Sequence, residues 1–170
     1  GKTGLFYHMW DWQTGERSPS LWGRGNGWVL MSIADTMEAM KPGSAAYGRL
    51  AEVAKRMAKG LAATQNRDGM WYTVMDDAGS YPEASATSMF AYGLLKLARL
   101  KVLPASEVTP VARRGWAAVN AKYVVDGKVT GVSAGTDPGG NENYRRIRLG
   151  SQTWGTGAYL MAGSEVDRLR

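Results

Sequence analysis

Apolar residues recur along most of the chain at the three- and four-residue spacing of an α-helix. Five helices are predicted, over residues 27–40, 45–65, 83–101, 110–123 and 153–169. Ser44 is placed to cap the second helix, and Thr109 followed by Pro110 is the pattern of a cap and a first helical position. The pattern therefore predicts an all-α protein.

Two of these helices differ in how their apolar residues are spread. In 45–65 the apolar residues form a stripe, and Lys and Arg occupy the other side, which is typical of an outer helix. In 83–101 Ala and Gly alternate with Met, Phe and Leu on nearly every face. A helix that is apolar all round is predicted to be buried.

The chain contains an internal repeat. Residues 4–11 read Gly-Leu-Phe-Tyr-His-Met-Trp-Asp, residues 69–76 read Gly-Met-Trp-Tyr-Thr-Val-Met-Asp, and 127–132 is a weaker echo. Each copy precedes a turn and a helix, so one unit is an extended segment, a buried helix and an outer helix. Tandem units of this kind build a solenoid or a closed α/α toroid. Their extended segments would share one rim, with Tyr7, His8, Trp10, Asp11, Trp22, Arg24, Trp71, Tyr72 and Asp76.

Composition narrows the possible partners. The 170 residues suffice for a single domain over 1–170, and the net charge of +6 favours an acidic partner. No nucleic-acid motif accompanies the basic cluster at 145–148, and no apolar run approaches the length of a membrane span. With no Cys and one His, disulfides, thiolate metal sites and multi-histidine metal sites are excluded. The compartment stays open between cytoplasmic and periplasmic or secreted.

Residues 22–28 carry the most distinctive chemistry, reading Trp-Gly-Arg-Gly-Asn-Gly-Trp. Two flat indoles beside a planar guanidinium suit a sugar ring that carries a carboxylate. Three glycines allow unusual backbone angles or the close approach of a ligand. The alternative is a helix N-terminus with core tryptophans and a solvated arginine.

Five motifs in order carry a family resemblance. They are residues 4–11, 22–28, 83–92, 131–136 and 155–165. Together they resemble the unsaturated glucuronyl and rhamnogalacturonyl hydrolases of glycoside hydrolase families 88 and 105, and 22–28 resembles family 105 more. The resemblance implies an (α/α)6 toroid of twelve helices. This chain would supply five or six of them with short extended rim segments, as an incomplete toroid that corresponds to the C-terminal half.

The resemblance also implies a reaction. The substrate would be an oligosaccharide ending in a 4,5-unsaturated uronic acid, with rhamnose as the linked sugar in family 105. An aspartic acid protonates the enol ether at C4, water adds at C5, and the hemiketal opens. No metal or organic cofactor is implied. The family's acid lies upstream in an Asp-Thr-x-x-Met context, which Asp11, Asp35 and Asp76 lack, so the proton donor is expected outside this chain.

Four residues match substrate-binding positions of the family: His8, Trp22, Arg24 and Trp28. Arg24 would face the substrate carboxylate, or else pair with Asp11 as a rim arginine. Trp22 and Trp28 lie on different helix faces, so Trp22 precedes the helix or one of them is core. His8 would bind the sugar or assist the water, or else play a structural part.

Four further positions have competing interpretations. Asn26 is a candidate helix N-cap. Asp11 and Glu83 would form a carboxylate pair, unless Glu83 caps the helix at 83–101. The arginines at 145, 146 and 148 are solvated or reach further sugar units.

A second function class remains open beside the hydrolase. The chain would then be a non-catalytic array of α-hairpins that binds acidic sugars or packs against a partner. An incomplete toroid exposes the flanks of its terminal inner helices, so self-association or a missing N-terminal half is expected.

Overall fold

The computed structural model describes residues 3–169, which are mainly helical. The helices are α1 (Gly23–Ala39), α2 (Ala45–Thr64), α3 (Ala84–Arg99), α4 (Ala105–Tyr123), α5 (Asn141–Arg145) and α6 (Thr153–Asp167). Four two-residue strands are β1 (Val124–Val125), β2 (Lys128–Val129), β3 (Val132–Ser133) and β4 (Leu149–Gly150). They form two antiparallel pairs, β1 with β2 and β3 with β4. The all-α prediction is confirmed.

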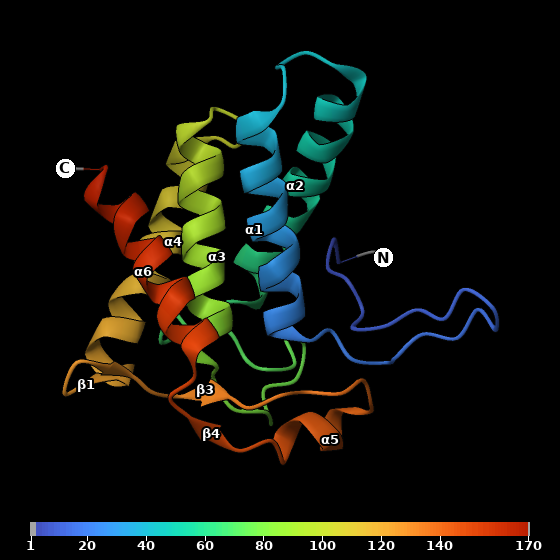
Figure 1. The fold of residues 1–170 in the computed structure, drawn as a ribbon, viewed down its shortest axis with the longest axis vertical. Coiled ribbons are helices and arrows are strands. Elements are labelled where there is room, and N and C mark those ends of the chain that lie inside the picture. The colour runs from blue at the N-terminus through green and yellow to red at the C-terminus, as the bar shows by residue number, and fades with distance from the viewer. Residues whose placement is uncertain (1–2, 170) are drawn as a thin grey trace.

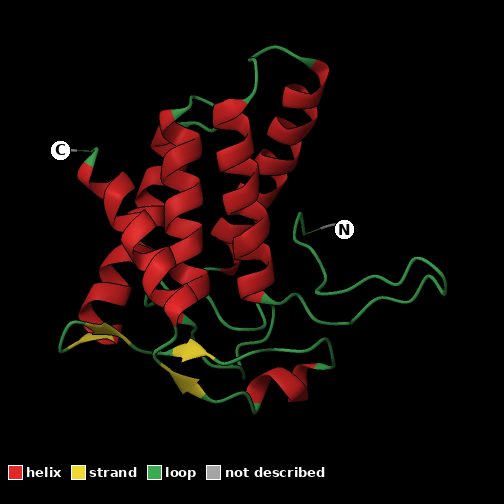
Figure 2. Ribbon diagram, viewed as in Figure 1, coloured by secondary structure: helices red, strands yellow, loops and turns green. Residues whose placement is uncertain are grey.

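The helices form an inner row and an outer row (Figure 1). α3 packs between α1 and α6, and these three inner helices run in the same direction. α2 and α4 return along the outside in the opposite direction. The N-terminal ends of the inner helices therefore meet at one end of the molecule, where Figure 2 shows most of the loops and the short strands.

α3 is the centre of the core. Every residue of α3 from Ala84 to Leu97 is buried, and only the last two residues of the helix, Ala98 and Arg99, are not. Small residues alternate with large apolar ones, so α1, α4 and α6 all approach it closely. The prediction that this helix is buried on all faces is confirmed.

Equivalent glycines explain the internal repeat. Gly4 and Gly69 have φ of +75° and +90°, in the left-handed region that glycine adopts without strain. A Cβ on Gly4 would overlap the Arg56 carbonyl of α2, and one on Gly69 would lie 2.7 Å from the Arg114 carbonyl oxygen of α4. Each unit thus starts where its extended segment lies directly against an outer helix.

Several predicted helix boundaries need correction. α1 begins at Gly23, four residues before the predicted start, and α3 and α6 each end two residues early. α4 begins at Ala105 and not at Pro110, because Pro104 accepts the N–H groups of Glu107 and Val108 as the N-cap. Pro110 lies inside α4, where its missing N–H removes a single helical hydrogen bond. The cap at Ser44 is confirmed, since its side chain accepts the N–H of Tyr47.

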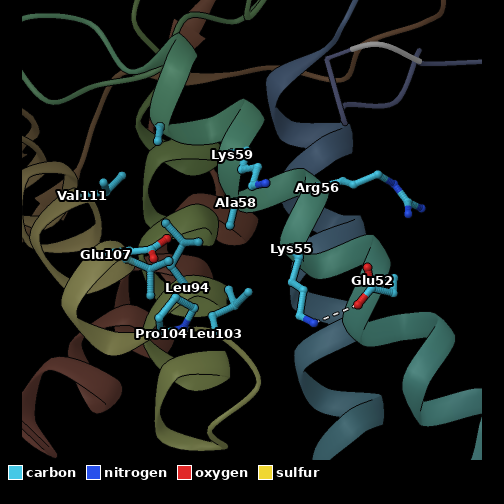
Figure 3. A pocket seen from close by; sticks show the side chains of 12 residues that line it. Glu52, Lys55, Arg56, Ala58, Lys59, Leu94, Leu103, Pro104, Glu107 and Val111 are labelled. Carbon is cyan, nitrogen blue, oxygen red and sulfur yellow. Dashed lines mark hydrogen bonds and ion pairs between the residues drawn. The ribbon is translucent and has the colours of Figure 1, made fainter.

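The outer helices diverge around a hollow of about 390 Å³ (Figure 3). Its floor includes Leu94 and Leu103, and its rim carries charged side chains such as Lys55, which pairs with Glu52 at 2.8 Å. Its lining residues lie in α2, α3, α4 and the turn between α3 and α4, and none of them lies in the loops at the N-terminal ends of the inner helices. Within residues 3–169, no helix has the length and apolar character that crossing a membrane requires.

Candidate functional site

Three segments interlock at the loop-rich end of the inner helices. The backbone N–H of Gly23 donates to Thr73 at 2.8 Å, and that of Met75 donates to Leu21 at 3.0 Å. Ala84 in turn donates to the Gly131 carbonyl at 3.0 Å. The rim segments of successive units are thereby joined into one surface, as the repeat predicts.

Glu83 is the buried hub of this surface. Its carboxylate is fully buried and accepts hydrogen bonds from Ser85 Oγ at 2.8 Å, Ala86 N at 2.6 Å and Ser133 N at 2.9 Å. A carboxylate at a helix N-terminus satisfies free N–H groups and faces the positive end of the helix dipole. The capping interpretation of Glu83 is confirmed.

Arg24 fixes the loop that follows β3. Nη1 donates to the Ser133 carbonyl at 2.7 Å and to Ser133 Oγ at 2.6 Å. Nη2 donates to the Ala134 carbonyl at 2.8 Å and to Thr136 Oγ1 at 3.2 Å. Only 4% of the residue is exposed, and Nη1 lies 3.9 Å from Glu83 Oε1. The buried ion partner of Arg24 is therefore Glu83.

Asp11 is engaged elsewhere. Its Oδ1 accepts the backbone N–H groups of Gln13 and Thr14 in its own turn. The alternative pairing of Arg24 with Asp11 is therefore not what the structure contains. Because Asp11 serves its own turn and Glu83 caps α3, the two also do not form the carboxylate pair considered from the sequence.

The His8 ring packs against Trp22 at a tilt of 36°, beside the arginine. The two ring centroids are 4.1 Å apart, and the Arg24 guanidinium lies 4.8 Å from the Trp22 ring centroid. His8 Nδ1 is 2.8 Å from the hydroxyl of Tyr144. Burial, and then the positive charge of Arg24, lower the pKa of His8, while Asp137 opposes them. The imidazole is therefore neutral near pH 7.

Two indoles in this cluster contain buried N–H groups without a partner. Trp22 is the N-cap of α1 and 8% exposed, so it does precede the helix. Within residues 3–169, neither its Nε1 nor that of Trp154 has a hydrogen-bond partner. Trp154 also lies against the Arg24 guanidinium, with its ring centroid at 5.3 Å. An unpaired buried donor is costly, so the two indoles mark a place where hydrogen bonding is incomplete beside Arg24.

Trp28 occupies a different place from Trp22. It is 45% exposed and lines a hollow of about 340 Å³ with Val29, Ser32 and Leu50. Trp28 is therefore neither a core residue nor part of the aromatic cluster of His8, Trp22 and Tyr144. Its predicted contact with substrate remains a prediction.

Asn26 joins the first segment to α1 instead of capping the helix. Its Oδ1 accepts the N–H of Phe6 at 2.8 Å, and its Nδ2 donates to the carbonyls of Phe6 and Trp22, both at 2.9 Å. The N-cap prediction was wrong because α1 begins at Gly23, three residues before Asn26. The actual function of Asn26 is to hold the His8 segment in place.

The predicted rim residues divide between surface and core. Trp71 is fully buried and donates from Nε1 to the Leu61 carbonyl at 2.9 Å, so its assignment to the rim was wrong. Trp10 is 68% exposed, and the Tyr7 ring lies under Arg17 at 4.3 Å. Tyr72 and Asp76 line a separate open hollow of about 600 Å³ with residues 63–68.

The basic cluster is partly structural. Arg145 donates from Nε and Nη2 to Asp77 Oδ2 at 3.0 and 2.7 Å, which ties α5 to the rim loop before α3. Arg146 pairs with Glu142 at 3.1 Å. For both arginines the structure provides acidic partners within the chain. Among the described residues, no group of acidic or histidine side chains is arranged to hold a metal ion.

Sequence reasoning missed Tyr144 and Trp154. Tyr144 is fully buried 136 residues away from His8 in the chain, and neither its spacing nor its neighbours indicate this contact. Trp154 begins α6 next to a glycine-rich stretch, which was a usable signal because the 22–28 motif has the same character. An indole beside glycines at the start of an inner helix recurs at the rim.

The fold is that of the α/α glycoside hydrolases. The sequence matches the family description "Glycosyl Hydrolase Family 88" over residues 1–170. The chain belongs to glycosyl hydrolase family 88.

Relatives with curated names extend well beyond this chain. It is 34% identical over 169 residues to an unsaturated 3S-rhamnoglycuronyl hydrolase of Alteromonas sp. (strain LOR), covering 96% of this chain and 40% of that protein. It is 29% identical over 167 residues to an unsaturated rhamnogalacturonyl hydrolase of Bacillus subtilis, covering 96% of this chain and 46% of the relative. The chain thus spans less than half the length of these two relatives.

Solved structures agree with the fold. A possible member of the GH105 family from Klebsiella pneumoniae superposes with a TM-score of 0.92 at 32% identity, over 98% of this chain and 44% of that one. A family 105 glycoside hydrolase from C. acetobutylicum gives 0.90 at 28% identity, over 99% and 53%. The helical rows described above are therefore part of an (α/α) toroid fold.

Proposed function

We propose that this chain forms the sugar-binding rim of an unsaturated uronyl hydrolase. The substrate is an oligosaccharide that ends in a 4,5-unsaturated uronic acid, as the names of the two relatives support. The observation that carries the proposal is the close packing of the His8 ring against Trp22 beside the buried Arg24, at the N-terminal ends of the inner helices. Aromatic faces and a fixed positive charge suit the flat, anionic end of such a sugar.

The positive charge of Arg24 is held in place by hydrogen bonds within the protein. Because the terminal nitrogens of Arg24 already serve Ser133, Ala134 and Thr136, the guanidinium acts on the sugar carboxylate through its field and through the loop it fixes. The aromatic rings of Trp22 and Trp154 lie beside it, with their centroids 4.8 and 5.3 Å from the guanidinium. This arrangement favours an acidic sugar over a neutral one.

The reaction is a hydration. A proton is added to C4 of the enol ether, water adds at C5, and the resulting hemiketal opens and releases the linked sugar. The carboxylates near the inner helices are engaged, since Glu83 caps α3 and Asp35 accepts from Tyr92 and Lys96. We propose that the proton donor comes from a part of the whole protein outside this sequence.

The carboxylate preference is tested with Arg24→Gln, which removes the charge, after circular dichroism has confirmed that the variant is folded. Binding of the unsaturated galacturonyl-rhamnose disaccharide and of its neutral methyl ester is measured by calorimetry. Because the charge acts through its field, its loss costs about 1–2 kcal/mol, and we expect affinity for the acid to fall roughly 5- to 30-fold. The ester should lose much less, and Arg146→Gln at the exposed C-cap of α5 should change neither. Equal losses for acid and ester would contradict the role in carboxylate recognition.

Catalysis is tested on the whole protein, by the loss of ultraviolet absorbance as the conjugated double bond is consumed. The proposal fails if the disaccharide binds but its absorbance never decreases. That outcome would favour the second candidate, a binding module without catalysis. The observation that favours a binding module is that Glu83, Asp35 and Asp11 all make structural hydrogen bonds.

A further inference from the structure

Tyr144 reaches His8 from the far end of the chain. Its side chain is fully buried, and its hydroxyl lies 2.8 Å from His8 Nδ1. The same hydroxyl is 3.3 Å from the backbone nitrogen of Gly139. The Tyr144 ring packs beside both His8 and Trp22, with centroid distances of 5.8 and 6.4 Å. Packing and hydrogen bonding therefore hold the Tyr144 oxygen in one place.

The direction of these hydrogen bonds follows from donor and acceptor chemistry. A backbone N–H only donates, so Gly139 donates to the Tyr144 oxygen. Burial raises the pKa of Tyr144, and hydrogen bonds from Gly139 and Ser18 oppose this rise, as bonds donated to the oxygen do. With the oxygen accepting from both, the hydroxyl proton of Tyr144 is left for His8 Nδ1. A neutral imidazole has one acceptor nitrogen and one N–H. If Nδ1 accepts, the proton of the ring is on Nε2.

We propose that Tyr144 is a positioning residue that holds His8 as the neutral Nε2–H tautomer. Within residues 3–169, Nε2 has no hydrogen-bond partner, and His8 is half-buried. The inference rests on the proposed function in one respect, namely that the sugar meets this nitrogen. His8 then donates a hydrogen bond to an oxygen of the sugar, and Nε2 does not act as a base toward the attacking water.

The competing arrangement is the other tautomer. His8 Nδ1–H would donate to the Tyr144 oxygen, and Nε2 would be free to accept a proton. The Gly139 nitrogen is a donor, so the hydroxyl proton of Tyr144 would then have to go to Ser18 Oγ, which already accepts the N–H of Met9 at 3.3 Å. The geometry therefore favours Nε2–H.

The tautomer of His8 can be measured without resonance assignment, because the sequence contains a single histidine. Long-range ¹H–¹⁵N spectra of the labelled protein report which ring nitrogen carries the proton. We expect a protonated-type signal at Nε2 and an unprotonated-type signal at Nδ1 near neutral pH. A wild-type protein with the proton on Nδ1 would overturn the proposal without any variant.

Tyr144→Phe tests whether the Tyr144 hydroxyl fixes the tautomer of His8. This change keeps the ring in its packing site and removes the hydroxyl, so the two nitrogen signals should move toward each other as the tautomers exchange. The matched control is Tyr159→Phe, whose hydroxyl donates to Asn120 Oδ1 at 2.8 Å on an exposed surface. Circular dichroism confirms that both variants are folded. An unchanged Nε2–H tautomer in Tyr144→Phe would assign the selection to something other than Tyr144.

Binding separates this inference from the proposed function. Affinity for the unsaturated disaccharide should fall with the competent fraction, roughly twofold when the tautomers become equally populated. A tautomer shift with unchanged affinity would overturn the donor role of Nε2. If the wild-type protein does not bind the disaccharide at all, the proposed function fails, while the spectra still decide the tautomer.

Discussion

At the scale of single residues, the rim depends on one buried ion pair and on the imidazole of His8, which packs between two aromatic rings. Glu83 is fully buried and Arg24 nearly so, and their closest charged atoms are 3.9 Å apart. Each also makes a hydrogen bond with Ser133 of β3. Two charges removed from water are tolerated only with such complete hydrogen bonding.

Glu83→Gln is expected to destabilise the protein strongly. The change leaves the Arg24 charge buried without its counter-ion, and breaking a buried pair costs about 3–5 kcal/mol. Urea unfolding followed by tryptophan fluorescence measures the loss. Glu107→Gln, at an exposed position in the first turn of α4, is the control and should change little. A Glu83 variant as stable as the control would show that the pair is dispensable.

The titration of His8 makes a second prediction at this scale. Because burial and Arg24 lower its pKa below the ordinary 6.5, the unfolded chain binds a proton more readily than the folded protein. The free energy of unfolding should therefore fall as pH drops from about 6.5 toward the folded pKa, and hold steady above that window. NMR titration of the single imidazole measures the folded value. Asp137→Asn should lower it further, since Asp137 opposes the shift. A higher pKa in that variant would contradict this electrostatic picture.

At the scale of elements, the repeat unit depends on the close approach of an extended segment to an outer helix. Gly69 combines a φ of +90° with a Cβ position 2.7 Å from the Arg114 carbonyl oxygen. Gly127 has a similar φ of +71° in the turn between β1 and β2, but nothing lies within 4 Å of its Cβ position. A comparison of the two glycines therefore separates the cost of backbone strain from the cost of steric crowding.

Gly69→Ala should therefore cost more stability than Gly127→Ala. Left-handed strain alone costs about 1–2 kcal/mol, and an overlap with a helix backbone adds about 1–3 kcal/mol. Thermal and urea unfolding of the two variants measures the difference directly. Equal losses would mean that the segment shifts away from α4 without cost.

The element scale also shows how much of the fold was predictable. Each inner or outer helix was predicted because its apolar spacing is a local property of the sequence. The start of α4 was misjudged because Thr109–Pro110 has the form of a helix beginning, although Pro104 already serves as the N-cap. Asn26 was misjudged for the same reason, since a cap residue inside a first turn makes tertiary hydrogen bonds instead.

At the scale of the whole molecule, the two flanking inner helices present apolar side chains to solvent. Trp28 on α1 is 45% exposed and Leu160 on α6 is 64% exposed. Both helices pack against α3. Exposed apolar faces of this kind indicate contacts with a further protein surface.

We expect the isolated chain to self-associate through these two flanks. Sedimentation velocity over a range of concentrations should show a rising average mass. The double variant Trp28→Gln with Leu160→Gln should remain monomeric at higher concentration, because it removes the apolar surface of both flanks. Trp12→Gln, which removes a 75% exposed indole from the first rim segment, is the control. A monodisperse wild-type monomer at every concentration would contradict the expectation.

The sequence by itself determined the all-α class, the repeating unit, the burial of α3 and the family resemblance. Helical spacing, glycines at the start of each unit and ordered motifs are all written in residues that are close together in the chain. Tertiary structure decided which side chains meet at the rim. Tyr144 reaches His8 across 136 residues, and the Ser133 backbone reaches Glu83 across 50. Such contacts depend on how loops close between packed helices, and loop closure leaves no periodic signal in the sequence.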